Sequence, residues 1–414
     1  MAGSNGRDDL SRRTFIKASA GAAAVAGLPL KVLADEKTKD EPKQHAPLPR
    51  RVLGRTGEKV TILNMGAGQA PSPRLLNAVY NAGIRFIDTA ATYGGGESEK
   101  NLGEWMTKTG RRKELIIVTK DMPKTPDEWV TMLDKRLEAL QTDYIDLFFL
   151  HAIGENEKRD SQYENTRDVP KSKEWAAAAE KMKKSGKCRF VGFSTHTEMS
   201  VRVALLNNAA AGGWVDAIMT SYDPKAVRDS AEFNKALDAC HKAGVGLICM
   251  KEMRGVDDMP EILPEFEEMG LTPWQAVLHA VWSDERIASI CSHLSNLVVV
   301  EENAAAARKF KKPMDKETVG AVIGLYERYA SGYCSGCDGR CRRAGKTDAA
   351  LNDITRALSY YERDGRRNDA RDLYTSLTPE QQDWHGADLE AASAACLCKL
   401  DFASLLPRAE KKLA

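Results

Sequence analysis

The sequence has no excess of charge of one sign and no long hydrophobic run. It contains 60 lysines and arginines and 59 aspartates and glutamates in 414 residues, a net charge of +1. A chain with balanced charges has no overall positive electrostatic field to attract a phosphate backbone, so no nucleic-acid partner is expected. No uncharged apolar stretch reaches the ~18 residues of a membrane-spanning helix, so no stable membrane span is expected either. Hydrophobic residues make up 43% of the chain, which is enough for a buried core and excludes bulk disorder.

The first 34 residues have the pattern of an export signal. Arg12-Arg13 precedes a charge-free run over residues 18–30, and the small residue Ala34 follows. As a helix this run would span only ~20 Å, too little to cross a bilayer. The pattern predicts a twin-arginine signal peptide over residues 1–34 and a periplasmic protein, with an amphipathic N-terminal helix as the alternative. The charged, proline-containing residues 35–50 are predicted to be a linker.

From residue 62 onward, short apolar runs alternate with helical patterns. The predicted strands cover residues 62–67, 85–90, 115–120, 144–151, 189–194, 217–221, 245–250 and 287–292. The predicted helices between them cover residues 73–82, 98–107, 126–139, 172–184, 198–208, 231–243 and 273–283. Eight strands alternating with helices indicate an α/β fold of the (β/α)8 TIM-barrel type, assigned to residues 51–312. The rival is an open doubly wound sheet, but its usual Gly-x-Gly-x-x-Gly turn is missing after Gly66-Ala67-Gly68.

Polar side chains stand where the predicted strands of this barrel end. Asp88 and Tyr93 follow the second strand, Lys120 ends the third, and His151 ends the fourth. In TIM barrels, reactive residues gather at the C-terminal ends of the strands. Each residue alone has an ordinary interpretation, such as a helix cap, a surface lysine or a buried histidine. Four ionisable groups at one end of adjacent strands favour a catalytic site.

These residues resemble the aldo-keto reductases. The similarity rests on Gly83-Ile-Arg-Phe-Ile-Asp88-Thr-Ala-Ala-Thr-Tyr93-Gly, Val118-Thr-Lys120 and Asp146-Leu-Phe-Phe-Leu-His151. It implies a catalytic tetrad of Asp88, Tyr93, Lys120 and His151, and hydride transfer between NAD(P)H and a small carbonyl or alcohol substrate. In such a tetrad Tyr93 donates a proton to the developing alkoxide, Lys120 lowers the tyrosine pKa, and Asp88 orients the lysine. His151 would position the substrate oxygen.

The resemblance also implies cofactor contacts around the other strand ends. The residues expected to contact NAD(P)H are Ser194, Thr195, Lys251, Ser295, Glu302 and Asn303. The family commonly has a glutamine where Met219 stands, and many NADP-binding members carry cations where His293 and Val299 stand. Without an arginine there, the 2′-phosphate loses a bidentate partner. We therefore expect NADPH to have little advantage over NADH.

The C-terminal residues 313–414 are predicted to form a helical, cysteine-rich domain. Cys334, Cys337 and Cys341 can place three thiolates on one loop, and Cys396-Leu-Cys398 follows. Tetrahedral zinc and a [4Fe–4S] cluster both fit such a set, and disulfides or a relic site are the alternatives. The arrangement resembles ferredoxin-like extensions of some aldo-keto reductases, which implies one [4Fe–4S] cluster held by Cys334, Cys337, Cys341 and Cys396. On a helix, Cys396 and Cys398 would point ~200° apart, so only one could face the cluster.

Together these features predict an exported oxidoreductase that resembles the aldo-keto reductases. The twin-arginine route carries folded proteins, so a cluster and a bound nicotinamide can both travel with the chain. A redox protein is a possible partner for electrons from the cluster. The alternative is a non-catalytic barrel that binds a ligand and keeps a structural metal. The charged loop at residues 154–171 follows the fourth strand and is expected either to cover the substrate or to be a solvated insertion.

Overall fold

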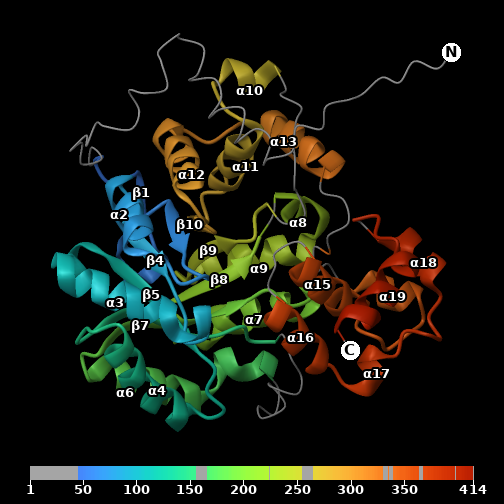
Figure 1. The fold of residues 1–414 in the computed structure, drawn as a ribbon, viewed down its shortest axis with the longest axis horizontal. Helices are drawn as coiled ribbons and strands as arrows, with labels where there is room; N and C mark the ends of the chain where they lie inside the picture. The colour runs from blue at the N-terminus through green and yellow to red at the C-terminus, as the bar shows by residue number, and fades with distance from the viewer. Residues whose placement is uncertain are drawn as a thin grey trace, which may run out of the picture.

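The computed structural model describes residues 45–154, 166–222, 224–253, 264–329, 334, 339–362, 367–396 and 398–413. Eight parallel strands form a closed barrel in the order β10-β3-β4-β5-β6-β7-β8-β9 (Figure 1). The strands are β3 (Leu63–Gly66), β4 (Phe86–Asp88), β5 (Ile116–Asp121), β6 (Ile145–Leu150), β7 (Cys188–Thr195), β8 (Ala217–Ser221), β9 (Gly246–Met250) and β10 (Ile287–Ser292). All eight predicted strands are confirmed, and so is the (β/α)8 barrel.

Helices surround the barrel and cover its strands. They are α2 (Pro73–Asn81), α3 (Glu97–Thr109), α4 (Pro126–Ala139), α6 (Lys173–Lys184), α7 (Met199–Gly212), α8 (Pro224–Asp229), α9 (Ala231–Lys242), α10 (Pro264–Glu268), α11 (Pro273–Trp282) and α12 (Leu297–Lys309). Three of them begin with a hydroxyl cap followed by proline: Ser72, Thr125 and Thr272 each accept a backbone N–H of the first turn. This local signal is why the predicted starts of α2, α4 and α11 match the structure.

A short antiparallel hairpin, β1 (Arg50–Val52) and β2 (Lys59–Thr61), precedes the barrel. Its Leu53 and Val60 are buried in a cluster with side chains of the barrel interior. Gly54 has φ +50, and a Cβ there would lie 2.3 Å from the Gly244 carbonyl oxygen, so the turn requires glycine. Leu48 is also buried. Residues 45–50 therefore belong to the folded barrel, which corrects the C-terminal end of the linker predicted over residues 35–50.

The C-terminal residues fold into helices, as predicted. Helix α13 (Lys316–Tyr329) packs on α11, with Val322 and Leu325 against Trp274. The chain continues as α14 (Arg340–Ala344), α15 (Leu351–Glu362), α16 (Arg367–Thr375), α17 (Pro379–Gln382), α18 (Leu389–Ala395) and α19 (Phe402–Leu413). These helices share a separate core, called here the C-terminal cluster, which includes Leu351, Ile354, Leu358, Phe402 and Leu406. They gather on one side of the barrel, beside α7 to α9 (Figure 1).

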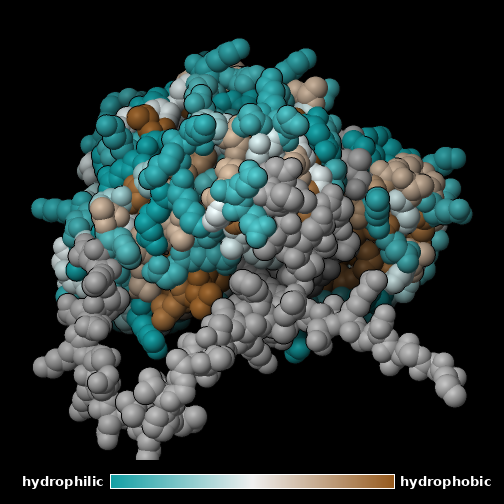
Figure 2. Space-filling model, turned by 90° about the horizontal axis from the view of Figure 1, so that it is seen from above, coloured by the Kyte–Doolittle hydropathy of each residue, from teal (hydrophilic) through white to brown (hydrophobic). Residues whose placement is uncertain are grey.

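Several sequence features lie outside the described residues: the predicted signal peptide, residues 155–165 of the charged loop, and Cys337. Within the described residues, the structure has no helix of the length and hydropathy needed to cross a membrane. The face shown in Figure 2 is mostly hydrophilic, with apolar atoms in separate patches.

Candidate active site

The ends of β4 and β5 carry a buried ion pair. Asp88 is the last residue of β4, and Lys120 is the penultimate residue of β5. Asp88 Oδ1 lies 2.6 Å from Lys120 Nζ, and both side chains are no more than 2% exposed. Lys120 Nζ also donates to the carbonyl oxygen of Thr89 at 2.9 Å and to the Tyr93 hydroxyl at 3.2 Å. The lysine therefore joins the Asp88 carboxylate to the Tyr93 phenol in one chain of contacts.

Tyr93 and His151 cover this ion pair at the barrel mouth. Tyr93 begins η3 (Tyr93–Gly96), in which all three glycines have positive φ, a conformation that glycine takes readily. This turn returns the tyrosine over the strand ends. His151 directly follows β6, and its ring meets the Tyr93 ring edge-on with the ring centroids 5.6 Å apart. Both side chains are half-buried. Of the four residues, the phenol and the imidazole are thus the groups that a small molecule at the mouth can reach.

Burial and charge act in opposite directions on the pKa values of this site. Burial raises the pKa of Tyr93 to about 12, and the positive charge of Lys120 opposes this rise. The net direction is the opposite of the lowering expected from the sequence, because an ionised phenol at this partly buried position loses hydration. Burial lowers the pKa of Lys120, but Asp88, Tyr93 and Cys291 together raise it by more, so the lysine stays charged. Near neutral pH, Tyr93 is therefore a neutral phenol beside a permanent cation.

Cys291 is a residue of this site that the sequence analysis missed. It lies in β10, and its thiol is hydrogen-bonded to the Asp88 carboxylate. Gly66 leaves the room for this contact, because a Cβ at that position would lie 3.2 Å from Cys291 Sγ. Burial raises the pKa of the Cys291 thiol well above its ordinary value, so the side chain is a neutral thiol. Its place near the end of the eighth barrel strand was the available signal in the sequence.

The residues expected at the nicotinamide end of a cofactor lie on another part of the mouth. Ser194 and Thr195 end β7, and both are buried. Ser194 Oγ accepts the Ala152 amide at 2.9 Å, and Thr195 Oγ1 donates to the Ile153 carbonyl oxygen at 2.9 Å. The two hydroxyls thus tie the end of β7 to the turn after β6. Lys251 directly follows β9, and its Nζ donates to the Tyr360 hydroxyl of α15 at 2.9 Å.

Of the residues expected at the adenosine end, Ser295 lies between β10 and α12, and Glu302 and Asn303 lie within α12. Asn303 Nδ2 donates to Ser292 Oγ at 3.0 Å, and Glu302 Oε1 accepts from the Thr272 hydroxyl at 3.2 Å. Ser295 is exposed just before α12. Ser295 thus precedes α12, and Glu302 and Asn303 stand in the middle of that helix.

The first turn of α12 offers the groups that an adenosine phosphate needs. Leu297 and Val298 are 38% and 50% exposed, an apolar pair next to the first backbone N–H groups of the helix. Helix N-termini favour phosphate, and exposed apolar side chains suit an adenine ring. Val299 is buried, whereas His293 is exposed. The residues present fit a dinucleotide, and position 299 offers its 2′-phosphate no cation.

The C-terminal cysteines lie in one region. Cys334 and Cys341 are buried in the C-terminal cluster, and Cys396 and Cys398 pack against it. Helix α18 ends at Ala395, so Cys396 and Cys398 stand in a turn, and their thiols are hydrogen-bonded to each other. This contact corrects the expectation that a helix would point the two apart. In the described part of the chain, no three Cys, His, Asp or Glu side chains are grouped to hold a metal ion.

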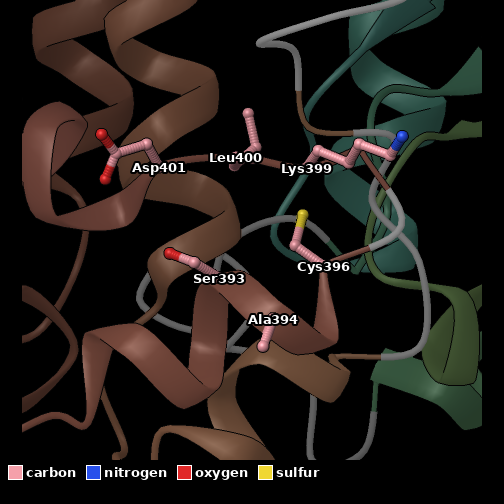
Figure 3. Close-up of a pocket in the computed structure, with 6 residues that line it drawn as sticks. All are labelled: Ser393, Ala394, Cys396, Lys399, Leu400 and Asp401. Atoms are coloured by element: carbon pink, nitrogen blue, oxygen red, sulfur yellow. The ribbon is translucent and has the colours of Figure 1, made fainter.

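Cys396 also lines a pocket on the surface of this region. The pocket is bordered by Ser393, Ala394, Lys399, Leu400 and Asp401, from the end of α18 and the turn that follows it. Figure 3 shows the Cys396 sulfur directed toward the segment of Lys399 and Leu400. The thiol is thus open to this pocket from one side.

Comparisons with known proteins agree with this geometry. The Aldo/keto reductase family profile matches residues 69–255, and the TAT (twin-arginine translocation) pathway signal sequence profile matches residues 9–29. L-galactose dehydrogenase of Arabidopsis thaliana is 28% identical over 319 residues, which cover 67% of this chain and 94% of the relative. Aldo-keto reductase yakc of Schizosaccharomyces pombe, whose name specifies NADP(+), is 26% identical over 208 residues, 45% of this chain and 56% of its own.

Solved structures show the same fold. The aldo-keto reductase from Klebsiella pneumoniae in complex with NADPH has a TM-score of 0.53 and 20% identity, covering 67% of this chain and 95% of its own. The holo form of an aldo-keto reductase from Bacillus halodurans has a TM-score of 0.52 and 20% identity, covering 67% and 96%. The family match includes Asp88, Tyr93, Lys120 and His151, and neither profile reaches the C-terminal cysteines. The chain thus carries an Aldo/keto reductase family domain behind a twin-arginine signal sequence, and it is an oxidoreductase of the aldo-keto reductase type.

Proposed function

We propose that this protein is an exported NAD(P)H-dependent oxidoreductase that interconverts a small carbonyl and its alcohol, with Asp88, Tyr93, Lys120 and His151 as the catalytic residues. The observation that carries the proposal is the contact chain from Asp88 through Lys120 to the Tyr93 hydroxyl. The family supports the use of NADP(H). The signal sequence supports export by the twin-arginine route, and we infer the periplasm as the destination.

A nicotinamide cofactor, when bound, would supply or accept the hydride. Ser194, Thr195 and Lys251 would lie at its nicotinamide end, and the start of α12 would lie at its adenosine end.

Tyr93 is the proton donor for the reduction. During reduction the substrate oxygen becomes an alkoxide, and the Tyr93 hydroxyl donates its proton to it. With a pKa of about 12, Tyr93 keeps this proton until a strongly basic oxygen develops. The phenolate that remains is stabilised by Lys120 Nζ, 3.2 Å away, and Asp88 holds that ammonium in place. The imidazole of His151 lies beside the phenol and can hydrogen-bond the same substrate oxygen.

The test is a pair of tyrosine variants. Tyr93→Phe should lower kcat for carbonyl reduction by ~10²-fold or more, the usual scale for a lost general acid, while NADPH binding stays the same. Tyr361→Phe is the matched control, because this tyrosine lies on α15 and packs against cations of α16 and α19. Equal turnover of the Tyr93→Phe variant and the parent contradicts the assignment. A protein that binds NADPH but reduces no aldehyde or ketone would instead support the non-catalytic barrel.

The [4Fe–4S] cluster and its redox partner stay predictions from the sequence. The gathering of Cys334, Cys341, Cys396 and Cys398 in one region supports a thiolate site. The described residues do not themselves form a ligand set, so no step of the proposed reaction passes through a cluster. Iron, sulfide and zinc analysis of protein purified without air is the test. Stoichiometric zinc, or two disulfides found by mass spectrometry, contradicts the cluster.

A further inference from the structure

Helix α15 of the C-terminal region lies against the barrel mouth. Two of its side chains, one helical turn apart and therefore on one face, contact barrel strand ends. Arg356 Nη1 donates to the carbonyl oxygen of His196 at 3.1 Å and lies 3.3 Å from His196 Nδ1. The Tyr360 hydroxyl accepts from Lys251 Nζ at 2.9 Å. Arg356 and Tyr360 are 2% and 6% exposed, so both contacts are shielded from water.

The two strand ends held by α15 are those at which the proposed function places the nicotinamide. His196 directly follows Thr195, the last residue of β7, and Lys251 directly follows β9. Lys251 has φ +62, a left-handed conformation that costs free energy for a residue other than glycine. Such a conformation persists where the surroundings hold it, and here the Tyr360 hydroxyl holds the lysine side chain. The residue that directly follows β9 is therefore held by a side chain 109 positions later in the chain.

Helix α15 is itself firmly anchored. Its opposite face contributes Leu351, Ile354 and Leu358 to the C-terminal cluster. Arg356 Nη2 pairs with Asp353 at 2.7 Å, which fixes the guanidinium on its own helix. The helix therefore acts as a rigid wall against the barrel, and moving it would break buried apolar contacts together with two polar contacts.

We propose that α15 is a wall of the cofactor cleft, and that Arg356 and Tyr360 are positioning residues that hold the ends of β7 and β9 and slow the release of a bound nicotinamide cofactor. The inference rests on the proposed function. It fits the twin-arginine signal sequence, because a protein exported in folded form leaves the cytoplasmic nucleotide pool behind. A slowly released cofactor would cross the membrane with the folded chain and remain bound in its cleft.

The test measures the release of NADPH from the full mature protein. Protein loaded with NADPH is mixed with excess NADP(+), and the loss of bound-NADPH fluorescence gives the release rate. Tyr360→Phe removes one hydroxyl and keeps the ring. It should speed release roughly tenfold, the scale of a hydrogen bond from a charged donor. Tyr361→Phe, on the same helix but directed toward α16 and α19, should release NADPH like the parent. Arg356→Met should act like Tyr360→Phe, with Arg367→Met as its matched control.

The outcomes separate this inference from the proposed function. Faster release from Tyr360→Phe, at an unchanged circular dichroism spectrum, supports the wall. Equal release from Tyr360→Phe and the parent overturns the inference, and so does a lower melting temperature without faster release, which would mean a purely structural contact. NADPH binding with equal release rates would leave the proposed function standing. Failure of the parent to bind either NADPH or NADH overturns both.

Discussion

Replacing Glu99 with glutamine should stabilise the protein at neutral pH and leave its stability unchanged in acid. Glu99 lies on α3 and is 1% exposed. Its Oε1 accepts from the Thr119 hydroxyl at 2.5 Å, and its Oε2 lies 3.0 Å from Arg136 Nη1. Burial raises the pKa of Glu99 from 4.5 to about 7, and the Thr119 hydrogen bond and the Arg136 charge oppose the rise. The carboxyl group thus titrates near neutrality in the folded chain.

The size of the effect follows from the two pKa values. Between pH 4.5 and 7 the folded chain holds a proton on Glu99 that the unfolded chain has released. Because the folded state then binds more protons, the free energy of unfolding falls as pH rises through this window, and the contribution is constant above it. Each pKa unit corresponds to 1.36 kcal/mol, so the full loss is about 3 kcal/mol. A glutamine cannot ionise, and its amide can still accept from Arg136 and donate to the Thr119 hydroxyl.

Urea unfolding of the parent and of Glu99→Gln, followed from pH 4.5 to pH 8, tests this reasoning. The difference in unfolding free energy should rise from near zero at pH 4.5 to about 3 kcal/mol in favour of the variant at pH 8. All other titrating groups are common to both proteins and cancel. Glu104→Gln, at an exposed position of the same helix, is the matched control for the Glu-to-Gln substitution itself. If the free energy of unfolding of Glu99→Gln and of the parent differed by the same amount at every pH, the reasoning would be refuted.

Three further predictions concern the proposed site. Alcohol oxidation needs the Tyr93 phenolate, so the oxidation rate should rise up to roughly tenfold per pH unit between pH 8 and 11. The rate of carbonyl reduction should stay flat from pH 6 to 9. An oxidation rate that levels off below pH 9 would count against a pKa of about 12 for Tyr93. Titration of NADPH and NADH should give dissociation constants within ~100-fold of each other, because Val299 is buried and uncharged. A larger preference for NADPH would mean that another cation binds the 2′-phosphate. Lys120→Met should destabilise the protein by about 3–5 kcal/mol, because it leaves the buried Asp88 carboxylate without its cation. Adding Asp88→Asn should recover part of the lost stability. A double variant no more stable than Lys120→Met alone would contradict the ion-pair explanation.

The sequence alone determined the barrel and predicted that Asp88, Tyr93, Lys120 and His151 gather at its mouth. Apolar runs separated by helical patterns predicted all eight strands, and three of the predicted helices begin at the proline of a Ser-Pro or Thr-Pro pair, because such signals act within a few residues. Asp88, Lys120 and His151 stand at the ends of consecutive parallel strands, and parallel strand ends meet at one edge of the barrel. Their proximity therefore followed from local positions once the barrel was recognised.

Only the tertiary structure decided the contacts that join distant segments. Cys291 meets Asp88 because the eighth strand closes the barrel beside the first, with a glycine between them. The pKa of Tyr93 rises because burial outweighs the lysine charge, and burial is a property of the whole fold. Tyr360 reaches Lys251 across 109 residues of chain. Periodicity and motif spacing describe a segment's own face and ends, but they do not determine which distant side chain packs on it.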